Sequence, residues 1–262
     1  MRALLKLILC EFQKIKRKKL FRIAFLTTFI MPVFYAMLLK GGNLDDMMSV
    51  VREENGFMLL LPLSVIVAAN LFFEEHDCDT LKNLLSVPVS KGQLAMAKML
   101  VLLLFDVGYI LTGYAVGVSI SIVTGASMDG WGQQLLLTFC TGILLWAAAM
   151  PCLLLVVWCN KSYIISVIIA FAYMVIGYLL HISDKIVMVP LGLNIQTFLP
   201  IPVIFRWLYQ YHSTGAMGEE FLAFYTRFQP YFISTPVVFA IMMGEAMVCM
   251  ALMVRIYQGQ KI

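Results

Sequence analysis

Six long runs of apolar residues alternate with shorter polar segments along the chain. The runs are 17 to 26 residues long, and an α-helix of about 20 residues crosses the hydrocarbon core of a bilayer. The pattern therefore predicts six membrane-spanning helices, at residues 20–39, 57–73, 99–124, 134–158, 163–180 and 233–254. Pro32 and Pro151 fall inside two of these runs and predict kinks there, because proline removes a helical hydrogen bond.

Composition supports the same class of protein. Hydrophobic residues make up 61% of the 262 residues and charged residues 13%, whereas soluble domains average about 45–50% and about 25%. A chain of this length could not hide so much apolar surface from water, so we expect an all-α polytopic membrane protein. No internal repeat or linker divides it, and residues 1–262 are predicted to form a single transmembrane domain.

Two regions outside the spans have patterns of their own. Residues 1–19 are basic and carry an apolar stripe at helical spacing, which predicts an amphipathic helix in the lipid headgroup layer. Residues 181–232 contain four prolines and many aromatic side chains, which favours an outer re-entrant or interfacial region over a seventh span. Aromatic side chains at this depth are typical of an anchoring belt at the membrane boundary.

The distribution of lysine and arginine predicts the orientation. With both termini in the cytoplasm, fourteen of these residues lie on the inner side and five on the outer side. Positive charge favours the cytoplasmic side of membrane proteins, so we expect both termini to be cytoplasmic.

The polar segment between the second and third runs contains an ordered set of helix signals. Asp79 can cap a short helix in which Leu81, Leu84 and Leu85 share one face. Pro88 ends that helix, since the residue before a proline is displaced from the helical region. Ser90 and Gln93 then form a capping box for the next helix.

This segment resembles the loop after the second span of ABC type 2 exporter permeases. The matching positions are Glu74 or Glu75, Thr80, Leu81, Leu84, Leu85, Pro88, Val89, Ser90 and Lys98. In that family the segment is a coupling helix that docks on the ATPase subunit, so the resemblance implies that residues 75–91 dock an ATPase. The chain departs from the family at Asp79, where glycine is usual, and at Lys82, where glutamate is usual. Its size and basic start look most like the permeases of bacteriocin-immunity and bacitracin-resistance exporters.

The resemblance implies a set of partners. The chain has no G-x-x-x-x-G-K-[ST] motif for nucleotide phosphates, so ATP and Mg²⁺ would bind a separate ATPase chain and this chain would bind no cofactor itself. Six spans make half a transporter, so a second permease, identical or different, would pair with it in the membrane lipid. We expect a bacterial cell membrane and an amphipathic peptide cargo, and no nucleic acid.

Residues Glu74 to Asp79 allow two other interpretations. Carboxylate, imidazole and thiol groups are all metal ligands, but consecutive residues rarely converge on one ion. An intramembrane protease of the Glu-Glu-x-x-x-Arg type would have arginine where Asp79 stands. The plainest alternative is a solvated, helix-capping acidic turn, and the leucine face would then lie on lipid headgroups.

Asp106 and Glu245 are the two acids within the predicted spans. An acid in the membrane is costly and indicates function unless a neighbouring Ser, Thr or Tyr bonds it. The predicted outer loops hold eight acids against five bases, which would favour cationic peptides or be an ordinary solvated surface. The alternatives to peptide export are a drug, lipid or polysaccharide exporter, an intramembrane hydrolase, and a membrane sensor or scaffold without transport.

Overall fold

The computed structural model of the protein describes residues 2–38, 43–77, 90–159, 163–212 and 219–259. Within these ranges the regular structure is helical and contains no strand. The longer helices are α1 (Arg2–Lys16), α2 (Lys19–Thr27), α3 (Ile30–Leu38), α4 (Leu44–Val50), α5 (Leu61–Asp77), α7 (Lys91–Thr124), α8 (Trp131–Cys159), α9 (Tyr163–Ile182), α11 (Pro200–Leu208), α12 (Glu219–Phe228) and α13 (Thr235–Gly259). The shorter elements are η1 (Val51–Leu60), α10 (Asp184–Val187), η2 (Ile195–Phe198), η3 (Tyr209–Tyr211) and η4 (Gln229–Tyr231).

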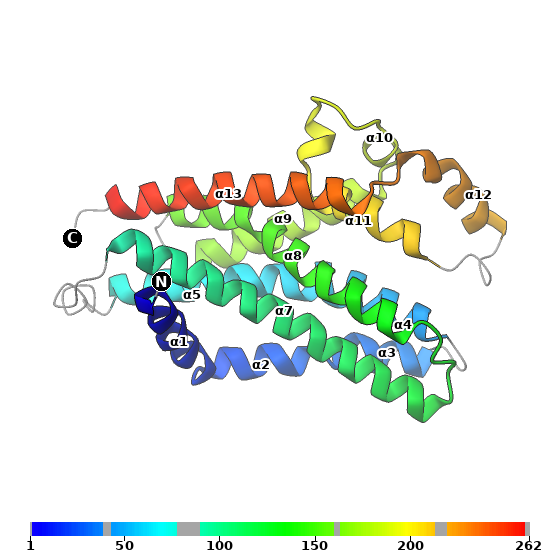
Figure 1. The fold of residues 1–262 in the computed structure, drawn as a ribbon, viewed down its shortest axis with the longest axis horizontal. Coiled ribbons are helices and arrows are strands. Elements are labelled where there is room, and N and C mark those ends of the chain that lie inside the picture. Colours follow the sequence, from blue (N-terminus) through cyan, green and yellow to red (C-terminus); the bar gives the residue numbers. More distant parts are fainter. Residues whose placement is uncertain (1, 39–42, 78–89, 160–162, 213–218, 260–262) are drawn as a thin grey trace.

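Six helical stretches in the described ranges are long and apolar enough to cross a membrane. They comprise Lys19–Leu38, Leu44–Phe72, Lys91–Thr124, Trp131–Cys159, Tyr163–Ile182 and Thr235–Gly259. The predicted all-α polytopic fold with six spanning helices is therefore confirmed. The stretches run roughly parallel, and α1 lies at the same end as the start of α7 and the ends of α5 and α13 (Figure 1).

The second span begins earlier than the sequence predicted. Residues 40–56 were expected to be a polar loop, but helix α4 starts at Leu44 and continues through η1 into α5. Its apolar face is buried, since Leu44, Met48 and Val51 are each at most 1% exposed. The η1 segment is a π-helix that ends two residues before Pro62. A π-helical segment shifts the hydrogen-bond register of a helix, and such shifts are associated with kinks.

The first span is interrupted near its middle, as Pro32 predicted. Helix α2 ends at Thr27 and α3 starts at Ile30, because Pro32 cannot donate a hydrogen bond to the carbonyl of Thr28 four residues earlier. The side chain of Asn55 donates to this carbonyl instead, at 2.9 Å. A freed backbone group inside the membrane is thus satisfied by a neighbouring span, which is how broken spanning helices are tolerated.

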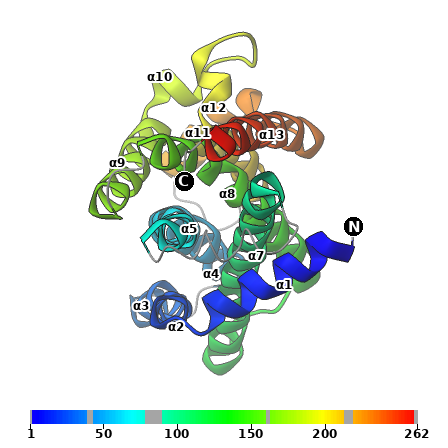
Figure 2. The same ribbon diagram turned by 90° about the vertical axis from the view of Figure 1, so that its left-hand side faces the viewer.

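The core of the bundle lies where α5, α7, α8 and α13 meet. The end-on view in Figure 2 shows α7 and α8 at its centre, α9 and α13 above them, and α2 and α3 at the lower left. Helices α7 and α8 approach closely at Gly142, where an added Cβ would lie 3.1 Å from the backbone of Val107. Nearby, the indole of Trp146 donates to the carbonyl of Met99 at 3.0 Å, which fixes the two helices together.

The region between α9 and α13 contains only short helices in its described parts. Helix α11 has nine residues and all of them are buried, because it packs against α8, α9 and α13. Gly177 of α9 makes room for it, since an added Cβ would lie 2.1 Å from Ile201. Trp207 and Phe228 are at most 1% exposed, so these two aromatic side chains pack inside the protein and do not form a membrane-boundary belt.

Helix α1 is amphipathic, as the sequence predicted, and packs on α7. Within its apolar stripe Ile15 is 3% exposed, and Ile8 and Phe12 pack against the core, while Leu5 is 56% exposed. Most of the stripe therefore contacts protein. The placement of residues 1–19 in the headgroup layer stays a prediction.

Candidate functional site

The predicted docking segment lies mostly outside the described residues. Thr80, Leu81, Leu84, Leu85 and Pro88 all fall in residues 78–89, and the interpretation of this stretch as a coupling helix stays a prediction. Glu74 and Glu75 lie in the last turns of α5, although the structure does not describe their side chains. The acidic cluster considered as a metal site also falls here.

Ser90 begins helix α7 as the sequence predicted. Its hydroxyl accepts a hydrogen bond from the backbone N–H of Gln93 at 3.2 Å, and the Gln93 side chain accepts from the backbone N–H of Ser90 at 3.3 Å. This capping box satisfies two backbone donors that the helix cannot pair internally. The third span therefore has a defined helix start at the end of the predicted docking segment.

Lys98 lies two turns into α7 and is completely buried. Its ammonium group donates to the carbonyl of Leu71 in α5 at 2.5 Å, and it lies 5.2 Å from the ring centre of Phe72 and 5.9 Å from that of Tyr257 in α13. Cation–π contacts of this kind are strongest where the cation is shielded from water. One side chain thus ties together the end of α5, the start of α7 and the end of α13.

Helix α1 is attached to the same end of the bundle. Lys18, just after α1, donates to the side chain of Asn70 in α5 at 2.5 Å. Glu11 is 3% exposed and accepts from Lys14 at 3.1 Å. The end of α1 is therefore joined to α5 by a part-buried polar contact, close to where the predicted docking segment begins.

The two intramembrane acids have different surroundings. Asp106 is completely buried in α7, and its Oδ2 atom accepts a hydrogen bond from the hydroxyl of Ser64 in α5 at 2.9 Å, the structural alternative considered for it. Its Oδ1 atom has no hydrogen-bond partner among the described residues. Glu245 in α13 is only half-buried and lines a cavity. Among the described residues, its buried Oε2 atom has no hydrogen-bond partner. The structure does not place the two acids in one site.

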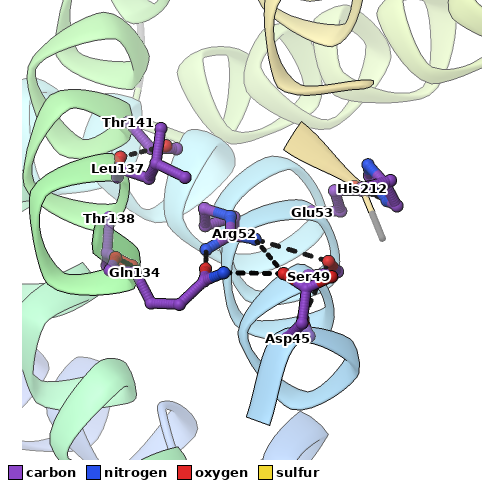
Figure 3. Close-up of polar contacts among 9 residues, drawn as sticks. All are labelled: Asp45, Ser49, Arg52, Glu53, Gln134, Leu137, Thr138, Thr141 and His212. Carbon is purple, nitrogen blue, oxygen red and sulfur yellow. Dashed lines mark hydrogen bonds and ion pairs between the residues drawn. The ribbon is translucent and has the colours of Figure 1, made fainter. Parts of the chain in front are cut away.

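A buried polar network ties the other end of the bundle together (Figure 3). Arg52 in η1 is 2% exposed and donates to the side-chain oxygen of Gln134 in α8. It also donates to Ser49 at 3.4 Å and lies 4.0 Å from a carboxylate oxygen of Asp45. Gln134 donates to the same Asp45 oxygen at 2.6 Å, which closes the network.

This network was not predicted from the sequence, because Arg52 and Asp45 were expected in a polar loop. A signal was present, since Leu44, Met47, Met48 and Val51 recur at helical spacing. Arg52, counted among the outer bases, is buried, and Asp45, counted among the outer acids, is only 18% exposed. The predicted excess of outer acids is therefore not a direct measure of the charge on the outer surface.

A neighbouring ion pair connects this network to the region after α11. The Nε2 atom of His212 lies 3.0 Å from a carboxylate oxygen of Glu53. Burial alone would lower the pKa of His212, but the hydrogen bond and charge of Glu53 outweigh it, so the pKa of His212 is raised. His212 also stacks on Tyr209, with ring centres 4.8 Å apart. Burial raises the pKa of Tyr209 to about 12, so its hydroxyl stays protonated at neutral pH.

The family model of the ABC-2 family transporter proteins matches residues 7–177, which is more than half of the chain. The chain belongs to the ABC-2 family. No curated protein matches it. The match runs from within α1 to the last turns of α9, so it includes Asp106, Lys98 and the predicted docking segment of this ABC-2 permease.

Membership of the family makes this chain a multi-pass membrane subunit of an ABC transporter, a class that generally works with an ABC ATPase. It supports a transporter subunit over an intramembrane hydrolase. In the described ranges no group of three or more histidine, cysteine or acidic side chains of the ABC-2 permease could hold a metal ion. Glu245 and most of its cavity lie beyond the matched residues, in the C-terminal third of the chain.

Proposed function

We propose that this ABC-2 permease is the membrane subunit of an ATP-driven exporter that removes an amphipathic cargo, most simply an antimicrobial peptide, from a bacterial cell membrane. A separate ATPase chain would supply ATP hydrolysis and dock on residues 75–91. A second permease, identical or different, would complete the pathway. Family membership and the lack of a phosphate-binding motif support this division of labour.

The contacts of Lys98 support the proposed coupling step, in which movement of the ATPase is transmitted to the spans. The docking segment connects α5 to α7, and Lys98 joins these two helices to α13 close to where the segment leaves the bundle. A movement imposed on the segment by an ATPase would therefore move three spans together. Ser90 would keep α7 helical up to its first residue during this movement.

The peptide cargo is the finer part of the proposal. A peptide in the membrane presents an apolar face and cationic groups, and the bundle offers an apolar cavity with one carboxyl group, that of Glu245. A drug, lipid or polysaccharide exporter is the alternative within transport. A polysaccharide would bind poorly in this cavity, because eight of the eleven lining residues carry no polar side-chain group.

The docking step can be tested by a single added charge. Leu84→Asp would place a carboxylate on the predicted apolar face, and the ATPase should no longer co-purify with the permease, since buried apolar anchors dominate helix-in-groove contacts. Asn83→Asp adds the same charge one position away, on the predicted polar face, and should leave co-purification intact. Normal co-purification of the Leu84→Asp variant would favour a sensor or scaffold without transport.

The proposed orientation has both termini in the cytoplasm. Ser127 lies exposed in the loop between α7 and α8, at the opposite end of the bundle from the end of α13 (Figure 1). In a cysteine-free background, an impermeant maleimide added to intact cells should label Ser127→Cys and should not label Gly259→Cys. The reverse pattern would invert the protein and place the docking segment outside the cell.

A further inference from the structure

A cavity of about 680 Å³ lies between α8, α9, α13 and the segment from η2 to the start of α11. Its volume is within the range of sites for small ligands, about 300–1,000 Å³. Pro151 lines it from α8, Tyr173 from α9 and Glu245 from α13. Glu245 is the eleventh of 25 residues in α13, so the cavity lies near the middle of the span.

The cavity contains few polar groups, and one of them is already hydrogen-bonded elsewhere. Among the eleven lining residues, only Tyr173, Glu245 and Cys249 carry an oxygen or sulfur on the side chain. The hydroxyl of Tyr173 donates its proton to the carbonyl of Ala148 at 2.8 Å, in the turn before Pro151. That proton is therefore not available to Glu245.

One carboxyl oxygen of Glu245 lacks a hydrogen-bond donor within the described part of the chain. Its Oε2 atom is buried and has no partner among the described residues, and no lysine, arginine or histidine lines the cavity. A carboxyl group in apolar surroundings is costly unless it is hydrogen-bonded or paired. A ligand that brings N–H donors and positive charge would satisfy this oxygen, and an apolar body would fill the rest of the cavity.

We propose that this cavity is a binding site for a hydrophobic primary amine, with the ammonium group on Glu245 and the apolar body against Pro151, Phe198 and Ile241. The rim is open to the outside of the bundle, since Val248 is 60% exposed and Phe198 is 52% exposed. The ligand therefore enters sideways from the lipid. This site deepens the proposed function, on which its role in transport rests.

Two sources supply the same chemistry, namely the lysine side chains of an amphipathic peptide and the amine headgroup of a phosphatidylethanolamine lipid. The test therefore measures binding without any ATPase, in nanodiscs made only of phosphatidylcholine, which has no N–H donor. The probe is a twelve-carbon primary amine bearing a photoreactive diazirine, and its control is the twelve-carbon alcohol with the same diazirine. Labelled peptides are located by mass spectrometry.

We expect the amine to label α13 around Glu245 about tenfold more strongly than the alcohol, as a charge-assisted hydrogen bond would produce. Glu245→Gln should abolish this preference, and Glu219→Gln, at an exposed acid of α12, should preserve it. Gly244→Leu should reduce labelling by both probes, because a Cβ there meets no atom within 4 Å and the side chain would fill the cavity. Gly132→Leu, at an equally open position on α8, is its control.

Addition of phosphatidylethanolamine or of a lysine-rich amphipathic peptide then identifies the source, since the natural ligand competes with the amine probe. Equal labelling of α13 by amine and alcohol in the unmodified protein would overturn the proposal, and so would labelling confined to other helices. Either result would leave ATPase docking through Leu84 untouched. Conversely, if Leu84→Asp left ATPase docking unchanged, the labelling experiment would still test amine binding independently.

Discussion

Asp106 and Glu245 are equivalent in the sequence, each a single acid within a long apolar helix, but the structure separates them. Asp106 is enclosed where α7 meets α5 and holds the hydroxyl of Ser64. Glu245 faces an open cavity, and its Oε2 has no donor among the described residues. An intramembrane acid is thus informative only together with its surroundings, because an enclosed carboxyl group that holds a neighbouring hydroxyl stabilises the bundle, whereas one that faces an open cavity points to a ligand.

The comparison extends to the basic residues inside the bundle. Arg52 and Lys98 each connect several helices through hydrogen bonds and ring contacts at opposite ends of the protein. We therefore expect the loss of stability on substitution to be largest for groups with several described partners and smallest for Glu245. The predictions that follow order these groups by the size of the expected loss.

Arg52→Met should have the largest effect. It keeps most of the apolar stem but leaves Asp45 and Gln134 without their shared donor, and removal of one partner of a buried ion pair costs about 3–5 kcal/mol. We expect the low end of that range, because Asp45 remains 18% exposed. The free energy of unfolding in mixed detergent micelles is the measurement, with exposed Arg227→Met as control. Equal losses in both variants would show that the network of Arg52 does not stabilise the bundle.

Asp106→Ala should be the next most damaging. It removes the acceptor of the Ser64 hydroxyl and opens a small gap between α5 and α7, and the loss of a buried hydrogen bond costs about 1–3 kcal/mol. The double variant with Ser64→Ala should lose little more than Asp106→Ala alone, since both remove the same contact. Additive losses in that cycle would contradict a structural pairing of these two residues.

The sequence predicted the class and the number of spans because hydrophobic length depends on the bilayer, which every span must cross. It also located the Ser90 cap and the break near Pro32, since both follow from local backbone chemistry. It could not predict that Asn55 repairs that break, or that Lys98 meets Tyr257, because these contacts join residues from different spans. The cavity of Glu245 was equally hidden, as it depends on the path of η2 and α11.

The start of the second span was predictable but was missed. Polar residues such as Arg52 and Asn55 lowered the apparent hydropathy of residues 44–56, although the apolar positions kept helical spacing. In the structure these polar groups satisfy one another and the broken first span. A polar residue inside a helical pattern can therefore lie within a membrane span if another span provides a hydrogen-bond partner for it.

The ion pair of His212 and Glu53 should make a smaller contribution, below about 1 kcal/mol, and one that depends on pH. The pKa of His212 is raised in the folded protein, so the stabilisation is present below the ordinary histidine pKa and is lost as pH rises through the folded value. Arg52 also lowers the pKa of this histidine and Asp45 also raises it. The difference in thermal midpoint between the natural protein and His212→Gln should shrink from about pH 5 to about pH 9. A difference that grows with pH would contradict this sign.

Glu245→Gln should change the free energy of unfolding least, by less than about 0.5 kcal/mol, the range of substitutions that break no described contact. Its Oε2 has no partner to lose, and the amide keeps the shape of the side chain in the cavity. If Glu245 serves transport, the same variant should nevertheless export less cargo from membranes that contain normal amounts of the protein. Asp106→Asn provides the contrast, because any loss of export there should follow the loss of folded protein. A Glu245→Gln variant as unstable as Asp106→Ala would mean that Glu245 has a structural partner in the membrane, such as a second permease, and the distinction between the two acids would then disappear.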